Sequence, residues 1–225
     1  MATTDIMNID FIQMKSAEIQ EKYNANGNDL ALMEECRITL STVDDWRYST
    51  GPVFDEPPYQ MELMGFSSGK LLKKKYPNFF EARLHGAYSS GFSDNQHLIT
   101  VAPSKPQNSP INTSRFNKSN GEVTIVHGYH HIDSNFNILK PAKLISLSSI
   151  FYLDKNTQAA ITIGRNEAKS IYLYYRNDLG LIKSVHLWTT GASAQSNYDF
   201  YYDTDGTLKT IKSGESIIWA SKGAV

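Results

Sequence analysis

The chain has 225 residues, of which 40% are hydrophobic and 20% charged, and its formal net charge at pH 7 is −1. Residues 1–62 are acidic and the remainder is basic only in a diffuse way, which argues against a nucleic-acid partner. The chain has no apolar run as long as a membrane-spanning helix, about 18 residues or more, and no secretory signal pattern at its start, so we expect a cytoplasmic protein with no membrane partner.

The first predicted element is a helix that starts near Asp10 and places Ile12 and Ile19 on one face. A second short helix is expected around Asp29–Glu35. From Cys36 to Leu40 apolar and polar residues alternate, which predicts a half-buried strand.

The middle of the chain is expected to form hairpins. One predicted hairpin joins two strands, Gln60–Gly65 and Leu71–Tyr76, through a Ser-Ser-Gly turn. Another joins Phe80–Ser89 to His97–Ala102 through a Gly-Phe-Ser-Asp-Asn turn. Residues 103–121 are rich in proline, serine and asparagine and show neither helix nor strand spacing, so we expect a long flexible loop there.

From Glu122 onward, short runs rich in β-branched and aromatic residues alternate with polar turns such as Asp205-Gly206. Tight turns between consecutive strands make neighbours antiparallel, and closing such a meander would remove its exposed edges. We therefore expect one mainly β domain over residues 1–225. Its architecture would be an antiparallel meander forming a closed or nearly closed lipocalin-like barrel with a short N-terminal helix; a β-sandwich or a lectin-like propeller fragment is the alternative.

Two resemblances arise in one segment. Ala159–Trp188 (AAITIGRNEAKSIYLYYRNDLGLIKSVHLW) resembles one blade of the fungal fucose-binding lectins, whose repeats pair an AAI-type strand with an aromatic strand and a G-I-x-x strand. The lectin resemblance implies a sugar site, for which Arg165 or Arg176, Glu167 and Trp188 are the matching residue types. The same segment resembles the C-terminal strands of lipocalin-like barrels, which implies a cavity for a small molecule.

The histidine cluster of the chain is the candidate for catalysis. On a strand, His127, Tyr129 and His131 share one face, and His130 points to the other. Imidazoles exchange protons near neutral pH, so His127, Tyr129 and His131 are candidate catalytic residues for an isomerisation or cyclisation. No third histidine lies at a matching spacing, and we expect neither a metal nor another cofactor.

Tyrosine is abundant, with 13 copies, and its ring is flat, apolar and able to hydrogen-bond. The candidate ligand-binding residues are Arg83, His85, Tyr172, Tyr174, Trp188 and Tyr201. The first functional hypothesis is a small-molecule-binding β-barrel that acts as an acid-base isomerase or cyclase on an apolar or aromatic ligand. The alternative is a carbohydrate-binding, lectin-like protein without catalysis. The partner would be a small-molecule or glycan ligand, and a homo-oligomer stays open.

Overall fold

The computed structural model describes Ile6 and residues 9–26, 31–104, 106, 109–192 and 195–222. Within these residues the fold is mainly β: one antiparallel sheet of 12 strands in which the strands follow one another in chain order. The strands are β1 (Asp45–Ser49), β2 (Tyr88–Ser93), β3 (Gln96–Val101), β4 (Ile111–Ser119), β5 (Glu122–Ile132), β6 (Ile138–Tyr152), β7 (Thr157–Gly164), β8 (Lys169–Arg176), β9 (Ile182–Thr189), β10 (Ser196–Tyr202), β11 (Leu208–Ser213) and β12 (Ser216–Ala220).

Tight turns produce the meander. Asp94 and Asn95 join β2 to β3 with φ values of 49° and 61°, and Asn120 and Gly121 join β4 to β5 with 52° and 77°. Two consecutive residues with positive φ form the turn that matches the right-handed twist of paired strands, and asparagine, aspartate and glycine adopt it most readily. The expected turn at Asp205-Gly206 is confirmed, because the Asp203 amide donates to the Thr207 carbonyl across it.

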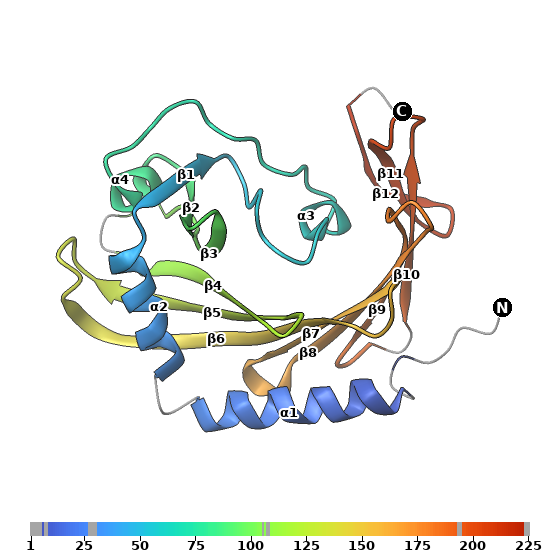
Figure 1. Ribbon diagram of the computed structural model, residues 1–225, viewed down its shortest axis with the longest axis horizontal. Coiled ribbons are helices and arrows are strands. Elements are labelled where there is room, and N and C mark those ends of the chain that lie inside the picture. The colour runs from blue at the N-terminus through green and yellow to red at the C-terminus, as the bar shows by residue number, and fades with distance from the viewer. Residues whose placement is uncertain are drawn as a thin grey trace.

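The sheet bends into a trough, with the middle strands as its floor and the first and last strands rising on opposite sides (Figure 1). Helices α1 (Asp10–Asn26) and α2 (Ala31–Thr42) pack on its convex face. The short 3-10 helix η2 (Arg165–Glu167) connects β7 to β8. None of the described helices has both the length and the apolar character that crossing a bilayer requires.

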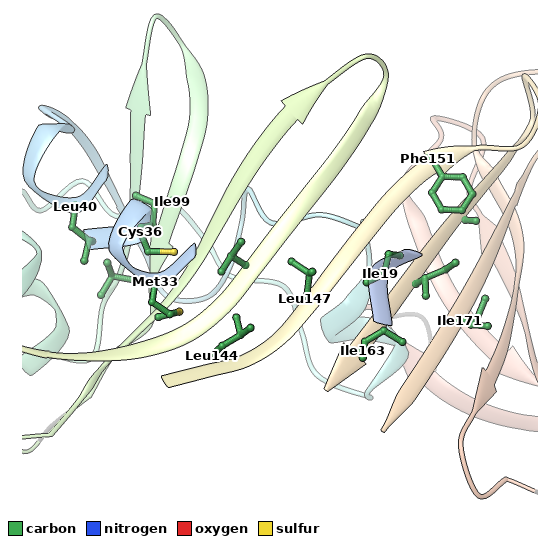
Figure 2. Close-up of a cluster of buried hydrophobic side chains, with 14 of the residues drawn as sticks. Ile19, Met33, Cys36, Leu40, Ile99, Leu144, Leu147, Phe151, Ile163 and Ile171 are labelled. Atoms are coloured by element: carbon green, nitrogen blue, oxygen red, sulfur yellow. The ribbon is translucent and has the colours of Figure 1, made fainter. Parts of the chain in front are cut away.

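The main hydrophobic core lies between the two helices and the convex face. Ile12 and Ile19 of α1, and Met33, Cys36 and Leu40 of α2, are buried against side chains from β3 to β8. Figure 2 shows Ile19 of α1 and Met33, Cys36 and Leu40 of α2 beside strand residues such as Ile99, Leu144, Leu147, Ile163 and Ile171. Burial of these apolar side chains holds α1 and α2 on the sheet.

A second core fills part of the concave face. The segment between β1 and β2 first forms α3 (Gln60–Leu63) inside the curve of the sheet and then reaches α4 (Phe79–Leu84) beside β1 (Figure 1). Phe79 of α4 belongs to the main core. Leu63 of α3 is buried against Tyr174, Phe200 and Ile211 of the later strands. This segment occupies the space that barrel closure would need.

The expectation of a closed or nearly closed barrel is therefore wrong. The strand order begins at β1 and ends at β12, and the two do not pair within the described residues. β1 instead bridges to Leu71 at Ser49, and the Leu72 amide donates to the Tyr48 carbonyl. The chain's own β1–β2 connection thus covers the edge of β1 that a barrel would have joined to β12.

Several local expectations also differ from the structure. Cys36–Leu40 is helical, because Met33, Cys36 and Leu40 are spaced three and four residues apart and bury one helical face. Gln60–Leu63 is helical rather than extended. Asp29, in the expected second helix, lies outside the described residues, and α2 runs on to Thr42.

The hairpin around Gly91 is shorter than expected, because α4 takes its first part. Asn78 Oδ1 accepts a hydrogen bond from the Glu81 amide at 3.0 Å, which caps the start of this helix. Residues 111–119, expected to be part of a flexible loop, form strand β4 and pair with β3 and β5. Residues 105, 107 and 108 of the expected loop lie outside the described residues.

Candidate functional site

The expected arrangement of the histidine strand is confirmed. Along the regular β4–β5 pairing, His127 lies opposite Ser114 and Tyr129 opposite Asn112, on the concave face. The rings of Tyr129 and His131 meet edge to face, with centroids 5.8 Å apart. His127 Nδ1 lies 3.1 Å from Ser114 Oγ, and burial lowers the pKa of His127.

The other expected ligand-binding residues do not form one site. Tyr172 and Tyr174 stack on the concave face with centroids 6.1 Å apart, and Tyr174 is fully buried, with its hydroxyl accepting a hydrogen bond from Gln60 Nε2. Trp188 lies on the convex face, where it packs against the main core. Tyr201 also points away from the concave core and is exposed.

Arg83 and His85, expected on one strand face, lie in α4 and at its end. His85 stacks on Tyr76 with ring centroids 5.7 Å apart. Arg83 is buried and its Nη1 donates to the Ser109 carbonyl and hydroxyl at 3.4 and 3.3 Å. Arg83 thereby ties α4 to the start of β4.

A cavity of about 440 Å³ opens where α2 crosses the ends of β5 and β6; we name it the α2 cavity. Its walls are mainly apolar. It is lined by Met33, Glu34 and Arg37 of α2, by His130, His131 and Ile132 of β5, and by Ile138, Leu139, Lys140, Pro141 and Ala142 of β6. Ile138 and Leu139 are 60% and 65% exposed, so its rim offers unusual apolar surface to solvent.

His130 lies at the buried side of this cavity. Only 1% of the residue is exposed, and its Nε2 has no hydrogen-bond partner among the described residues. Burial, the largest cause, lowers the pKa of His130 to about 4, so the ring is neutral at neutral pH. A buried nitrogen without a partner costs about 1–3 kcal/mol. The nitrogen is closed off in this structure, so a ligand would recover part of that cost only if the ring turns toward the cavity.

The charged side chains that line the α2 cavity differ in whether they have an oppositely charged partner. Arg37 pairs with Glu34 through two hydrogen bonds, one of 2.8 Å from its Nε. Lys140 is exposed and forms no hydrogen bond or ion pair within the described part of the chain. The free cation of this cavity is therefore Lys140.

A second cavity, of about 540 Å³, lies beside the first and shares His131, Ile132, Leu139 and Lys140 with it. Its remaining wall comes largely from α4, including Phe80 and Arg83. The two cavities flank the outer end of the β5–β6 hairpin. Of the residues expected from sequence, only His131 and Arg83 line either of these two cavities.

A separate polar network lies on the concave floor. The Thr100 hydroxyl donates to Asp55 Oδ1 at 2.6 Å and lies 3.0 Å from His97 Nε2. The His97 ring is enclosed by Phe54, Phe92 and Phe116. Burial raises the pKa of Asp55 to about 6 and lowers that of His97 to about 4.

No group of three or more histidine, cysteine, aspartate or glutamate side chains is placed to hold a metal ion in the described ranges. Cys36 is buried in the main core, and burial raises the pKa of its thiol to about 12. The thiol is therefore protonated at neutral pH and is a poor nucleophile.

Sequence reasoning missed most of the α2 cavity. Met33 of α2 lies more than 100 positions before Lys140 and Ala142 of β6, and no local sequence pattern links it to them. The exposed pair Ile138-Leu139 next to a lysine is the one local signal that could have been noticed. No protein-family model, curated protein or solved structure matches this chain.

Proposed function

We propose that this protein binds a small, mainly apolar molecule that carries one anionic group, and that the α2 cavity holds it. The observation that carries the proposal is His130, a buried imidazole without a partner in the wall of an apolar cavity. The volume of about 440 Å³ lies within the usual range for small-molecule sites, about 300–1,000 Å³.

The lining suggests how such a ligand lies. Its apolar body would contact Met33, Ile132 and Leu139, and a polar group would hydrogen-bond to His130. Lys140 at the mouth supplies a positive charge that no protein carboxylate neutralises in the described chain. These groups favour an apolar anion over a neutral sugar or a cation.

The expected acid-base chemistry is a narrower form of this proposal. Of His127, Tyr129 and His131, only His131 is among the residues that line the α2 cavity. His131 would exchange a proton with the bound molecule in an isomerase or cyclase. Binding alone needs fewer assumptions, and the sugar-binding alternative has weaker support because Tyr174 and Trp188 pack against the two cores.

The proposal is tested with 8-anilinonaphthalene-1-sulfonate, an apolar anion, and with N-phenyl-1-naphthylamine, its neutral analogue. We expect both to bind with enhanced fluorescence and the anion to form a one-to-one complex. Lys140→Gln should weaken the anion about fivefold, because an exposed ion pair contributes up to about 1 kcal/mol, and leave the neutral analogue unchanged. Ala142→Leu fills the cavity and should weaken both.

The matched control is Lys143→Gln, on the same strand and also exposed but outside the cavity lining. It should leave the affinity for both probes unchanged. If Lys140→Gln and Ala142→Leu both bind the anionic probe as the wild type does, the α2 cavity is not the binding site.

A further inference from the structure

Residues 51–69 form a closed loop over the concave face. At its neck the Thr50 amide donates to the Lys70 carbonyl at 3.0 Å, and the Lys70 amide donates to Thr50 Oγ1 at 2.9 Å. Gly51 and Gly69 touch there so closely that a Cβ on Gly69 would lie 2.3 Å from the Gly51 nitrogen. Only glycine fits at this crossing, so the two ends of the loop are fixed together.

This loop surrounds a cavity of about 560 Å³, which we name the loop cavity. Its lining is apolar and acidic and contains no lysine, arginine or histidine. The lining residues are Pro52, Val53, Asp55, Glu56, Pro57, Pro58, Tyr59, Gln60, Met61, Glu62, Met64, Ser68 and Gly69. The loop cavity therefore offers negative charge within apolar walls.

Three polar side chains of the loop are anchored to the sheet. Asp55 accepts the Thr100 hydroxyl, Glu56 forms an ion pair with Lys118, and Gln60 donates to the Tyr174 hydroxyl. These contacts hold the cavity wall against the concave face. Each of the three side chains therefore already has a partner within the protein.

Glu62 is different. It lies in α3, only 5% of the residue is exposed, and it lines the loop cavity. Among the described residues its carboxylate has neither a hydrogen-bond donor nor a cationic partner. The carboxylate oxygens are not closed off from the cavity that they line, so a ligand that brings hydrogen-bond donors and positive charge can reach them.

We propose that the loop cavity binds an organic cation, a primary ammonium on an apolar body, with Glu62 as its counter-ion. The ammonium hydrogens would donate to the Glu62 carboxylate, and Asp55 would add a second negative charge. Tyr59, whose ring is fixed 5.5 Å from that of Phe200, and Met61 would contact the apolar body. A metal ion fits less well, because no three metal-binding side chains converge in the described residues.

The test uses phenethylamine, which is an ammonium at neutral pH, and 2-phenylethanol, which has nearly the same shape without the charge. Calorimetric titration of the full chain should show saturable binding of the amine and at least tenfold weaker binding of the alcohol. Glu62→Gln should weaken the amine at least tenfold and leave the alcohol unchanged. Glu215→Gln removes the same charge from an exposed position on the β11–β12 turn. It should leave the affinities for the amine and the alcohol unchanged.

Glu62→Gln should fold, because the carboxylate that it replaces has no partner in the described protein; a thermal unfolding midpoint at or above that of the wild type would show this. If this variant does not fold, the comparison of amine with alcohol on the wild type decides. The proposal is overturned if the alcohol binds as tightly as the amine, or if folded Glu62→Gln binds the amine unchanged. Lys140→Gln should not affect the amine, which separates this site from the α2 cavity.

Discussion

At the scale of one residue, His130 is a side chain whose burial lowers the stability of the fold. The ring is buried beside the α2 cavity, and its Nε2 lacks a partner in the described structure. We expect His130→Phe to raise the free energy of unfolding at pH 7 by about 1 kcal/mol, because it removes a desolvated nitrogen and keeps an aromatic ring in place.

Urea unfolding at pH 7 measures this change. The control is His131→Phe, one position along and half-buried on the other face of β5, which should alter stability by less than about 0.5 kcal/mol. A loss of stability in His130→Phe would mean that the nitrogen has a partner, such as ordered water, and would remove the main support for a ligand there.

At the scale of elements, α2 is held on the sheet by a close contact with β5. A Cβ on Gly128 would lie 2.5 Å from the Met33 sulfur and 2.6 Å from the Lys143 carbonyl oxygen. The methionine can move, but the backbone oxygen of the neighbouring strand cannot. Gly128→Ala should therefore lower the free energy of unfolding by about 1–3 kcal/mol through overpacking.

Chemical denaturation checks this prediction, and Gly164→Ala is the matched control. Gly164 is also in a strand, has no positive φ, and a Cβ there would meet its nearest atom at an ordinary 3.7 Å. This control should be nearly neutral. If Gly128→Ala is also neutral, α2 does not pack on β5 as closely as the structure shows.

The elements differ in how far their sequences predicted them. The later strands were predicted well, because their alternation is reinforced by polar turns at both ends. The alternation of Cys36–Leu40 predicts a strand, but a short amphipathic helix can show the same alternation over five residues, and this segment is helical. Strand β4 was missed since Ile111–Ser119 is polar, and its pairing with β3 and β5 comes from the neighbouring strands.

At the scale of the whole molecule, barrel closure could not be predicted because it depends on where the β1–β2 connection goes. The same holds for both cavities. The α2 residues that line the α2 cavity with His130 lie about 100 positions earlier in the sequence, and the loop cavity depends on the contact of Gly51 with Gly69. The alternation of the sequence predicts which face of β5 each histidine occupies, but it does not predict which elements cover that face.

The whole protein should lose stability in mild acid. His97 and His130 have pKa values near 4 in the folded chain, mainly through burial, against 6.5 for exposed histidine. As pH falls from about 6.5 to about 4, the unfolded chain binds protons that the folded chain does not, so the free energy of unfolding falls. Asp55, with its pKa raised to about 6 by burial, acts in the opposite direction over part of this range, whereas the lowered pKa of His127 acts in the same direction as those of His97 and His130.

Urea unfolding at pH 7, 5.5 and 4 measures this dependence. His130→Phe should show a shallower decline than the wild type, because only His97 then contributes from this pair. A stability that is flat or rises toward pH 4 would show that these imidazoles are not buried as neutral rings.

The open sheet has two edges, and they are unequal. The C-terminal end of β1 is covered by the chain itself through Leu71 and Leu72, whereas β12 pairs with one strand only within the described residues. An uncovered strand edge is a template for strand addition from another molecule. Two copies joined antiparallel through β12 would pair this edge in both molecules, so growth through β12 would end at a symmetric pair and could not continue into a fibre.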